Sequence, residues 1–157
     1  MKTIRVEEIL RPHGTCASSV TENTDLEEVI AKFAENPAIR GIFIVDSKHR
    51  FLGIIRSTDL RNWVQFRILK EYGTYRALSA WEAYHFISAK KSVDLVYGDR
   101  HSLGVKKNDT LQTALDKMVE HETNILPVLD NADRIIGDLL ISDVLSKAVE
   151  TGKQANK

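Results

Sequence analysis

Two aspartates, Asp59 and Asp143, occupy equivalent positions in the two halves of the sequence, where the residue pattern predicts that a helix begins. Each directly follows a residue with a hydroxyl group, Thr58 or Ser142. An aspartate at a helix start lies among backbone N–H groups without helical partners and near the positive end of the helix dipole, so it stays ionised without a partner cation. Such a carboxylate is a fixed acceptor for two adjacent hydroxyl groups of a ligand. The alternative, that both are ordinary carboxylates of helix N-termini, stays open.

These positions belong to an internal repeat, which the sequence shows as pairs of matching residues in the same order. A one-residue difference in length between the two copies falls near residues 36–39, where a loop would absorb it. Because the repeat is much longer than the roughly 20–50 residues of a solenoid unit, it predicts two duplicated domains packed together. The matching pairs are Val20 and Val105, Asn23 and Asn108, Leu26 and Leu111, Asp46 and Asp130, Arg50 and Arg134, Gly53 and Gly137, and Asp59 and Asp143.

Each copy shows the same succession of hydrophobic periodicities. A helical spacing of apolar residues is followed by two short apolar segments joined by a polar turn, which predicts a helix and then a hairpin. A further helix opens at Ser57 in the first copy and at Ser142 in the second. With a short strand before the first helix, each copy is β-α-β-β-α, and its helices must cover one face of a small sheet. The predicted helical stripes are Leu26, Val29, Ile30, Phe33 and Leu111, Ala114, Leu115, Met118, and the predicted strands are Ser18–Val20, Ile42–Val45, Phe51–Ile55, Leu103–Val105, Leu126–Leu129 and Ile135–Leu140.

Residues 61–91, between the copies, are rich in aromatic side chains and form two helical patterns, Leu60–Glu71 and Tyr75–Ala89. These helices either cover the core or a subunit interface, or they form an aromatic platform for a ligand base or a partner. The predicted organisation is a first domain over residues 1–60, a helical connector over 61–91, a second domain over 92–150 and a flexible tail over 151–157. The aromatic residues are Trp63, Phe66, Tyr72, Tyr75, Trp81, Tyr84 and Phe86.

Composition excludes several classes of protein. The 157 residues contain 22 Lys+Arg and 22 Asp+Glu, and this balance argues against non-specific binding of nucleic acid. The single cysteine, Cys16, has no partner for an internal disulfide, which fits a reducing, cytoplasmic setting. No apolar run approaches the ~20 residues that cross a membrane. The five histidines have no spacing typical of a metal site, and no catalytic constellation appears around Cys16 or elsewhere, so we expect neither a metal nor an enzyme.

Two segments, Phe43–Leu60 and Leu126–Val144, resemble the signature of the CBS (cystathionine-β-synthase) domain. That signature is an apolar strand, a turn that begins with aspartate, and a glycine followed by apolar residues, a Thr or Ser, and an aspartate. The resemblance implies an α+β fold of two β-α-β-β-α domains packed with pseudo-twofold symmetry. In many members of the family the two clefts between such domains bind AMP, ADP, ATP or S-adenosylmethionine.

The resemblance also implies roles for residues of the clefts. Asp59 and Asp143 would accept from the two hydroxyl groups of a ribose, with Thr58 and Ser142 beside them. The positions that contact the ligand before the strand proline are Ile39 and Arg40 in the first copy and Thr123 and Asn124 in the second. The segments Cys16–Val20, with Cys16 and Ser18, and His101–Val105, with Ser102, would meet the adenine.

Two positions depart from the family signature. The Thr or Ser expected three residues before the aspartate is Arg56 in the first copy and Leu140 in the second. Leu140 cannot bond a phosphate or a ribose, whereas Arg56 can, and together with Arg40 it would favour a polyphosphate if the two share a cleft. The two clefts are therefore expected to be unequal.

The sequence thus predicts a regulatory, signalling module that senses an adenosine nucleotide and controls a partner protein. It is expected to need no enzyme cofactor and to form a homodimer through its helix faces. The alternative is a scaffold protein with vestigial clefts that binds a partner enzyme or transporter through its helices.

Overall fold

The computed structural model describes residues 3–11, 17–69, 88–96 and 101–155. They fall into two compact units, one of residues 15–100 and one of residues 1–14 together with 101–157. We call these the first-copy unit and the second-copy unit. The predicted domain boundaries at residues 60 and 91 stay predictions.

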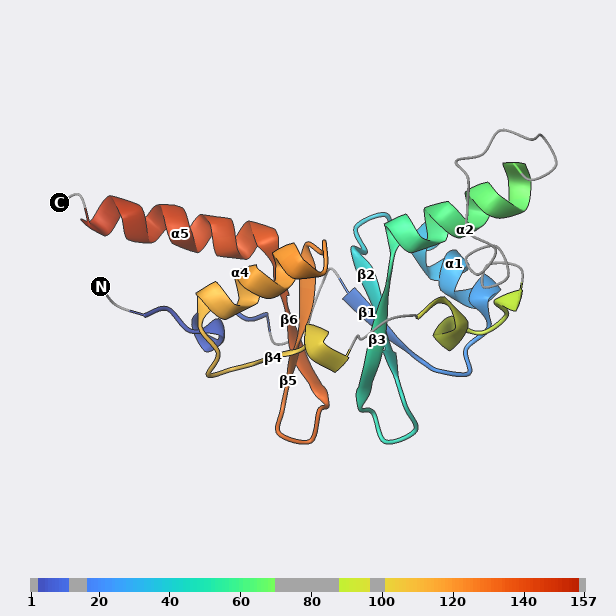
Figure 1. Ribbon diagram of the computed structural model, residues 1–157, viewed down its shortest axis with the longest axis horizontal. Coiled ribbons are helices and arrows are strands. Elements are labelled where there is room, and N and C mark those ends of the chain that lie inside the picture. Colours follow the sequence, from blue (N-terminus) through green and yellow to red (C-terminus); the bar gives the residue numbers. More distant parts are fainter. Residues whose placement is uncertain (1–2, 12–16, 70–87, 97–100, 156–157) are drawn as a thin grey trace. The chain divides into compact units, whose positions relative to one another are not determined.

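The first-copy unit is a three-stranded mixed sheet with two helices on one face (Figure 1). Its strands lie in the order β1-β2-β3, with β1 parallel and β3 antiparallel to β2. Alternate strand residues such as Ile42, Ile44 and Ile55 are fully buried and form one core with the helices. The elements are β1 (Ala17–Thr21), α1 (Leu26–Glu35), β2 (Gly41–Val45), β3 (Phe51–Arg56), α2 (Ser57–Leu69) and the 3-10 helix η2 (Ser92–Leu95).

The second-copy unit repeats this architecture, and the α+β fold of two β-α-β-β-α units is confirmed. Its strands lie in the order β4-β5-β6, again with one parallel and one antiparallel pairing. Helix α5 extends into residues 151–155, where a flexible tail was expected. The elements are the 3-10 helices η1 (Val6–Glu8) and η3 (His101–Leu103), then β4 (Val105–Lys106), α4 (Leu111–Glu120), β5 (Ile125–Leu129), β6 (Ile135–Leu140) and α5 (Ile141–Ala155).

The predicted strand Leu103–Val105 is wrong at its first two residues, because Leu103 ends the 3-10 helix η3 and the strand begins only after Gly104. The side chain of Lys117 donates to the carbonyl oxygens of Ser102 and Gly104, both at 2.6 Å. These bonds hold the chain in a turn up to the start of β4.

The hairpin turns confirm the repeat at atomic detail. Asp46 accepts hydrogen bonds from the backbone N–H groups of Lys48 and Arg50, and Asp130 does the same for Ala132 and Arg134. In both turns these backbone bonds lower the pKa of the aspartate. The residue directly before the arginine of each turn, His49 or Asp133, has a positive φ of 61°.

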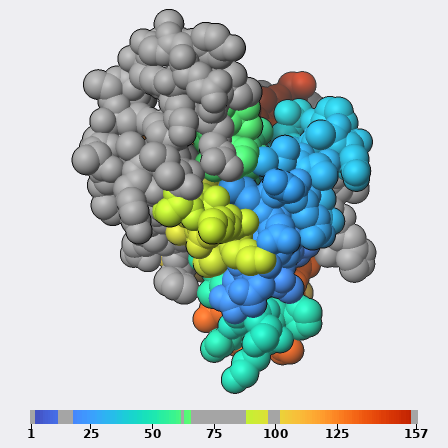
Figure 2. All heavy atoms as spheres, turned by 90° about the vertical axis from the view of Figure 1, so that its right-hand side faces the viewer, coloured from blue at the N-terminus to red at the C-terminus, as the bar shows by residue number. Residues whose placement is uncertain are grey.

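The repeat also includes a short segment in front of each copy. Residues 88–96 lie directly against the start of α1 (Figure 2), where the N–H of Leu26 donates to the carbonyl of Lys90 at 3.0 Å. Residues 3–11 take the same place in the second-copy unit, where the N–H of Leu111 donates to the carbonyl of Ile4 at 2.9 Å. The segment that precedes each copy in the chain therefore packs on the other copy's first helix.

The predicted aromatic connector lies largely outside the described residues. Of its aromatic side chains Trp63 is described, and it is buried in the core of the first-copy unit. Among described side chains, the ring contact is an edge-on pair of Phe43 and Phe51, with centroids 6.0 Å apart, and it belongs to the hairpin. The described residues show no aromatic cluster.

Candidate functional site

The predicted site residues of the first copy come together at one edge of its sheet. The pairing of Gly41 with Arg56 places Arg40 beside the end of β3, and the first turn of α2, which follows directly, carries Thr58 and Asp59. The parallel pairing of Ala17 with Gly41 brings the start of β1, with Ser18, to the same edge. Thr58 and Arg40 are exposed at this edge. Cys16 lies outside the described residues.

Asp59 is buried and held by an arginine. Its Oδ2 accepts from the backbone N–H of Arg56 at 2.9 Å and from Nε of the same residue at 3.1 Å, and its Oδ1 accepts from Nη2 at 3.0 Å. The aspartate is 6% exposed. The signature position occupied by Arg56 thus supplies Asp59 with a partner cation, which the prediction from the helix N-terminus did not include.

Asp143 is held in the same way by an arginine from a different part of the chain. Its carboxylate accepts from Nε of Arg11 at 3.0 Å and from Nη2 at 2.7 Å. The backbone N–H of Leu140 adds a weaker bond at 3.4 Å. Arg11 lies 132 residues away in the sequence and ends the segment that packs on this unit. Both helix-start aspartates are therefore clamped by two N–H groups of a guanidinium.

This clamp limits what either carboxylate can accept. A carboxylate has about four lone-pair sites, and three bonds are already made to each one. Two-pronged arginine–carboxylate pairs are among the stronger hydrogen-bonded arrangements in proteins. A ligand that offers two adjacent hydroxyl groups to Asp59 or Asp143 must therefore displace at least part of the guanidinium.

The remaining predicted residues of the second copy have mixed roles. The hydroxyl of Thr123 is buried and donates to the carbonyl of Ile125 at 3.0 Å, so it stabilises the strand start. Asn124 is exposed, and its carbonyl accepts from the N–H of Ile141 at 2.9 Å, which places it beside the start of α5 and the exposed Ser142. The hydroxyl of Ser102 lies 3.1 Å from Nε2 of His121.

In the first copy Ile39 packs against the hydrophobic core, which favours a structural role for it. Leu140, at the departure from the signature, is buried.

Arg11 and Asp138 are site residues that were not predicted from the sequence. Asp138 lies in β6, is 1% exposed, and its Oδ1 has no hydrogen-bond partner in the described part of the chain. Burial raises the pKa of Asp138, the charge of Arg11 opposes this, and the charge of Asp143 adds to it. Asp138 could have been found in the sequence, because it is a charged residue inside an apolar strand and matches the apolar Ile54 of the first copy. Arg11 had no such signal, because its contact spans the length of the chain.

Among the described residues, no group of three or more His, Cys, Asp or Glu is arranged to hold a metal ion. No helix in the same ranges combines the length and the apolar character needed to span a lipid bilayer.

The family model of the CBS domain matches residues 6–65 and 99–150. The chain belongs to the CBS domain family. The two matched ranges make it a tandem CBS pair, which confirms the resemblance drawn from the hairpin and helix-start residues. No curated protein sequence matches this chain.

Solved structures of other proteins share the fold at low sequence identity. The CBSX2 protein in complex with AMP is 19% identical, with 95% of this chain and 98% of that chain covered and a TM-score of 0.67. The CBS domain pair of protein MJ0100, in complex with 5′-methylthioadenosine and S-adenosyl-L-methionine, is 18% identical, with 97% and 99% covered and a TM-score of 0.65. The cytosolic domain of the Mg²⁺ channel MgtE, in complex with ATP, is 18% identical, with 91% and 48% covered and a TM-score of 0.63.

Proposed function

We propose that this CBS pair is a regulatory module that senses an adenosine nucleotide or S-adenosylmethionine and controls a partner protein. The observation that supports this most directly is the recurrence of a hydroxyl residue and a buried or half-buried aspartate at the same sheet edge in both copies. The similar structures with bound AMP, ATP and S-adenosylmethionine support the choice of ligand class.

The residues divide between two parts of such a ligand. Asp59 and Asp143 accept from ribose hydroxyl groups, with Thr58 and Ser142 as nearby donors. Arg40 and Arg56, which the strand register places at one edge, give the first copy a positive charge suited to phosphate. The second copy has Asn124 in place of Arg40, so we expect it to prefer a ligand with less negative charge.

Sensing requires that the filled and empty modules differ. A ligand can shift a conformational equilibrium only by the difference between its affinities for the two states. The arginine clamps supply such a difference, because a ligand that takes either aspartate must rearrange a guanidinium that holds it in the empty state.

Thermal unfolding with AMP, ADP, ATP and S-adenosylmethionine tests the ligand class. At about 100 times the dissociation constant, a ligand at one site is expected to stabilise the fold by about 2.7 kcal/mol. The double variant Asp59→Ala/Asp143→Ala is expected to lose this shift, measured against its own ligand-free melt. Asp116→Ala removes an exposed aspartate of α4 that bonds Gln112 and serves as the matched control. Full binding by the double variant would show that the aspartates have another role.

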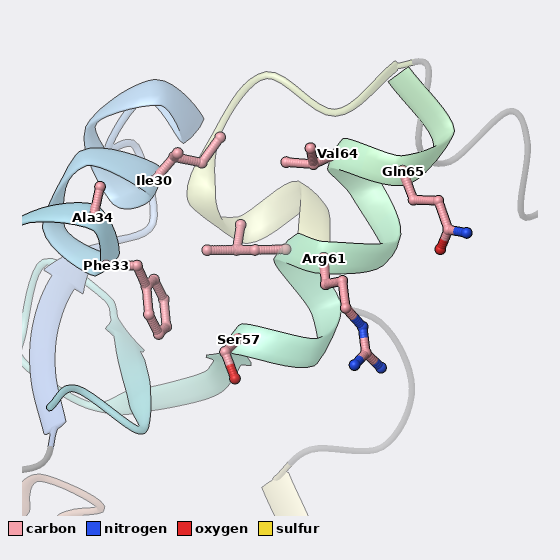
Figure 3. A pocket seen from close by; sticks show the side chains of 8 residues that line it. Ile30, Phe33, Ala34, Ser57, Arg61, Val64 and Gln65 are labelled. Atoms are coloured by element: carbon pink, nitrogen blue, oxygen red, sulfur yellow. The ribbon is translucent and has the colours of Figure 1, made fainter. Parts of the chain in front are cut away.

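The helices of both units carry apolar surface, which indicates association with another protein. In the first-copy unit, α1 and α2 flank an apolar groove of about 710 Å³ in which Ile30 and Val64 point toward one another (Figure 3). In the second-copy unit, α4 and α5 expose Val119 (77%), Leu145 (57%) and Val149 (58%). Exposed apolar side chains that gather on one face typically mark an interaction surface. We propose that these faces form a homodimer; a scaffold role for them is the alternative.

Two charges on the exposed face of α5 test the dimer. The variant Leu145→Glu/Val149→Glu is expected to be monomeric in sedimentation equilibrium at concentrations where the unchanged chain is dimeric, because like charges would be buried at the interface. The variant Ser146→Glu/Gln154→Glu adds the same charge to the same helix at other exposed positions and should stay dimeric. A monomeric wild-type chain at all concentrations, or a dimer in both variants, would exclude this face.

A further inference from the structure

The N-terminal strap, residues 3–11, belongs to the second-copy unit (Figure 1) and is hydrogen-bonded to it near both of its ends. Near its start, the N–H of Val6 donates to the carbonyl of Asp109 at 2.9 Å, and the side chain of Val6 is fully buried. At its end, Arg11 pairs with β6: the N–H of Arg11 donates to the carbonyl of Asp138 at 3.1 Å, and the N–H of Asp138 donates back at 3.2 Å. The backbone of the strap therefore holds Arg11 in place independently of its side chain.

The side chain of Arg11 lies near two carboxylates, those of Asp143 and Asp138. It holds Asp143 through two hydrogen bonds, and it lies opposite Asp138 as an antiparallel bridge partner. Side chains of directly opposed residues on an antiparallel pair have Cβ atoms about 4.5–5.5 Å apart, which is within reach of a long side chain. Asp138 is buried, and its Oδ1 has no hydrogen-bond partner among the described residues. A second acceptor for the guanidinium is therefore already present beside the first.

The first copy differs in the source of its arginine and at the position that matches Asp138. Its clamp joins Arg56 and Asp59 within one turn of chain, and the position that matches Asp138 is the apolar Ile54. The combination of a distant arginine, an occupied aspartate and a buried spare carboxylate is specific to the second copy.

We propose that Arg11 is an internal switch that closes the carboxylate of Asp143 in the empty module and moves to Asp138 when ligand hydroxyl groups take Asp143. The proposal rests on the proposed function, since it assumes a ligand that uses Asp143. The movement needs only a change of side-chain rotamer, because the backbone pairing between Arg11 and Asp138 can stay intact. Asp138 keeps the displaced charge paired, and this lowers the cost of opening the site.

The switch makes two substitutions act in opposite directions on binding. Without Arg11 the carboxylate of Asp143 is open, so Arg11→Ala should tighten binding at the second copy. In Asp138→Asn the displaced guanidinium loses its charged acceptor and keeps at most a neutral amide oxygen there, so this variant should weaken binding. Coupling between two sites of a protein typically amounts to 5–150-fold in affinity, and we expect about tenfold for each variant.

Calorimetric titration with adenosine tests the proposal. Adenosine carries the ribose hydroxyl groups but no phosphate, so a loss of positive charge does not act through the phosphate. All variants are made with Asp59→Ala, which removes the first copy's carboxylate and leaves binding at the second. Arg5→Ala removes another arginine of the strap, whose side chain bonds the carbonyl of Asn108 rather than Asp143, and is the matched control.

The expected result is about tenfold tighter binding with Arg11→Ala, about tenfold weaker binding with Asp138→Asn, and no change with Arg5→Ala. In the double variant Arg11→Ala/Asp138→Asn, Asp138 should no longer matter, and the affinity should equal that of Arg11→Ala. Unchanged or weaker binding by Arg11→Ala, or an additive double variant, would overturn the switch while the proposed function stands. If none of adenosine, AMP, ADP, ATP and S-adenosylmethionine binds the unchanged chain or any variant, the proposed function itself fails, and the switch with it.

Discussion

Replacement of Gly137 by alanine is expected to destabilise the second-copy unit by about 2–3 kcal/mol, the upper range for overpacking of a close contact. A Cβ at this position would lie 2.4 Å from the carbonyl oxygen of Arg11 and 2.7 Å from Cδ1 of Leu10. The first of these atoms is a backbone oxygen that accepts the N–H of Asp138 in the bridge between Arg11 and Asp138. It therefore cannot move away without breaking hydrogen bonds. The glycine of the CBS signature is here required by the N-terminal strap.

Urea unfolding measures the loss of stability, and amide hydrogen exchange at Arg11 and Asp138 shows where it arises. Both N–H groups are expected to exchange faster in Gly137→Ala, because the strap is pushed away from β6. Gly152→Ala is the matched control: a Cβ there meets no atom within 4 Å, and in a helix alanine is preferred over glycine by up to about 1 kcal/mol. Equal stability of Gly137→Ala and the unchanged chain, with slow exchange at Arg11, would show that the strap yields without cost.

The helices and strands could be predicted because the sequence contains each pattern twice, once in each copy. The apolar stripe that begins at Leu26 recurs at Leu111, and the helices begin at these residues in both units. The predicted strand Ile135–Leu140 has the observed bounds of β6. Periodicity is a local property, and two matching occurrences reduce the chance that either is accidental.

The packing of the strap could not be predicted in this way. Residues 3–11 have no regular apolar spacing, and their contacts join residues more than a hundred positions apart, as with Arg5 and Asn108. The resemblance of η1 to η2 is carried by hydrogen bonds rather than by residue identity, since Arg5 and Lys91 both donate a backbone N–H to an acid three residues later. Such similarity appears only once the backbone is known.

At the candidate site, the position of the two aspartates was predictable from the sequence, but the arginines that pair with them were not. The helix-start aspartates lie at the sheet edges, as the repeat and the turns imply. The prediction from the helix N-termini did not pair Arg56 with Asp59, three residues later, and could not have found Arg11. The substitution of Leu140 for an arginine in the second copy is offset by a cation from elsewhere, so the two sites are more alike in structure than in sequence.

Replacement of Asp138 by isoleucine is expected to stabilise the chain by about 1–3 kcal/mol at neutral pH, the usual cost of a buried polar group left without a partner. Isoleucine copies the first copy, where Ile54 occupies the matching position and is 3% exposed. The backbone pairing with Arg11 does not use the side chain of Asp138 and should persist.

The stability gained by Asp138→Ile should increase as the pH rises from about 4 to neutral. Burial raises the pKa of Asp138 in the folded chain above its ordinary value, so the folded state holds this proton more tightly than the unfolded state. The favourable contribution of the protonated acid is complete below the unfolded pKa of about 3.9 and is lost as the pH rises through the folded value. The advantage of Asp138→Ile over the unchanged chain is therefore largest at neutral pH and shrinks toward pH 4.

Urea unfolding at several pH values measures this difference, with Asp116→Ala as a control for loss of an exposed aspartate. A gain that is independent of pH would show that packing, not the ionised carboxylate, sets it; a loss of stability would show that the charge of Arg11 already compensates Asp138. Chains commonly retain a destabilising residue where it serves a function. If Asp138→Ile both stabilises the fold and weakens adenosine binding at the second copy, the buried carboxylate costs stability in order to receive Arg11 when the ligand site opens.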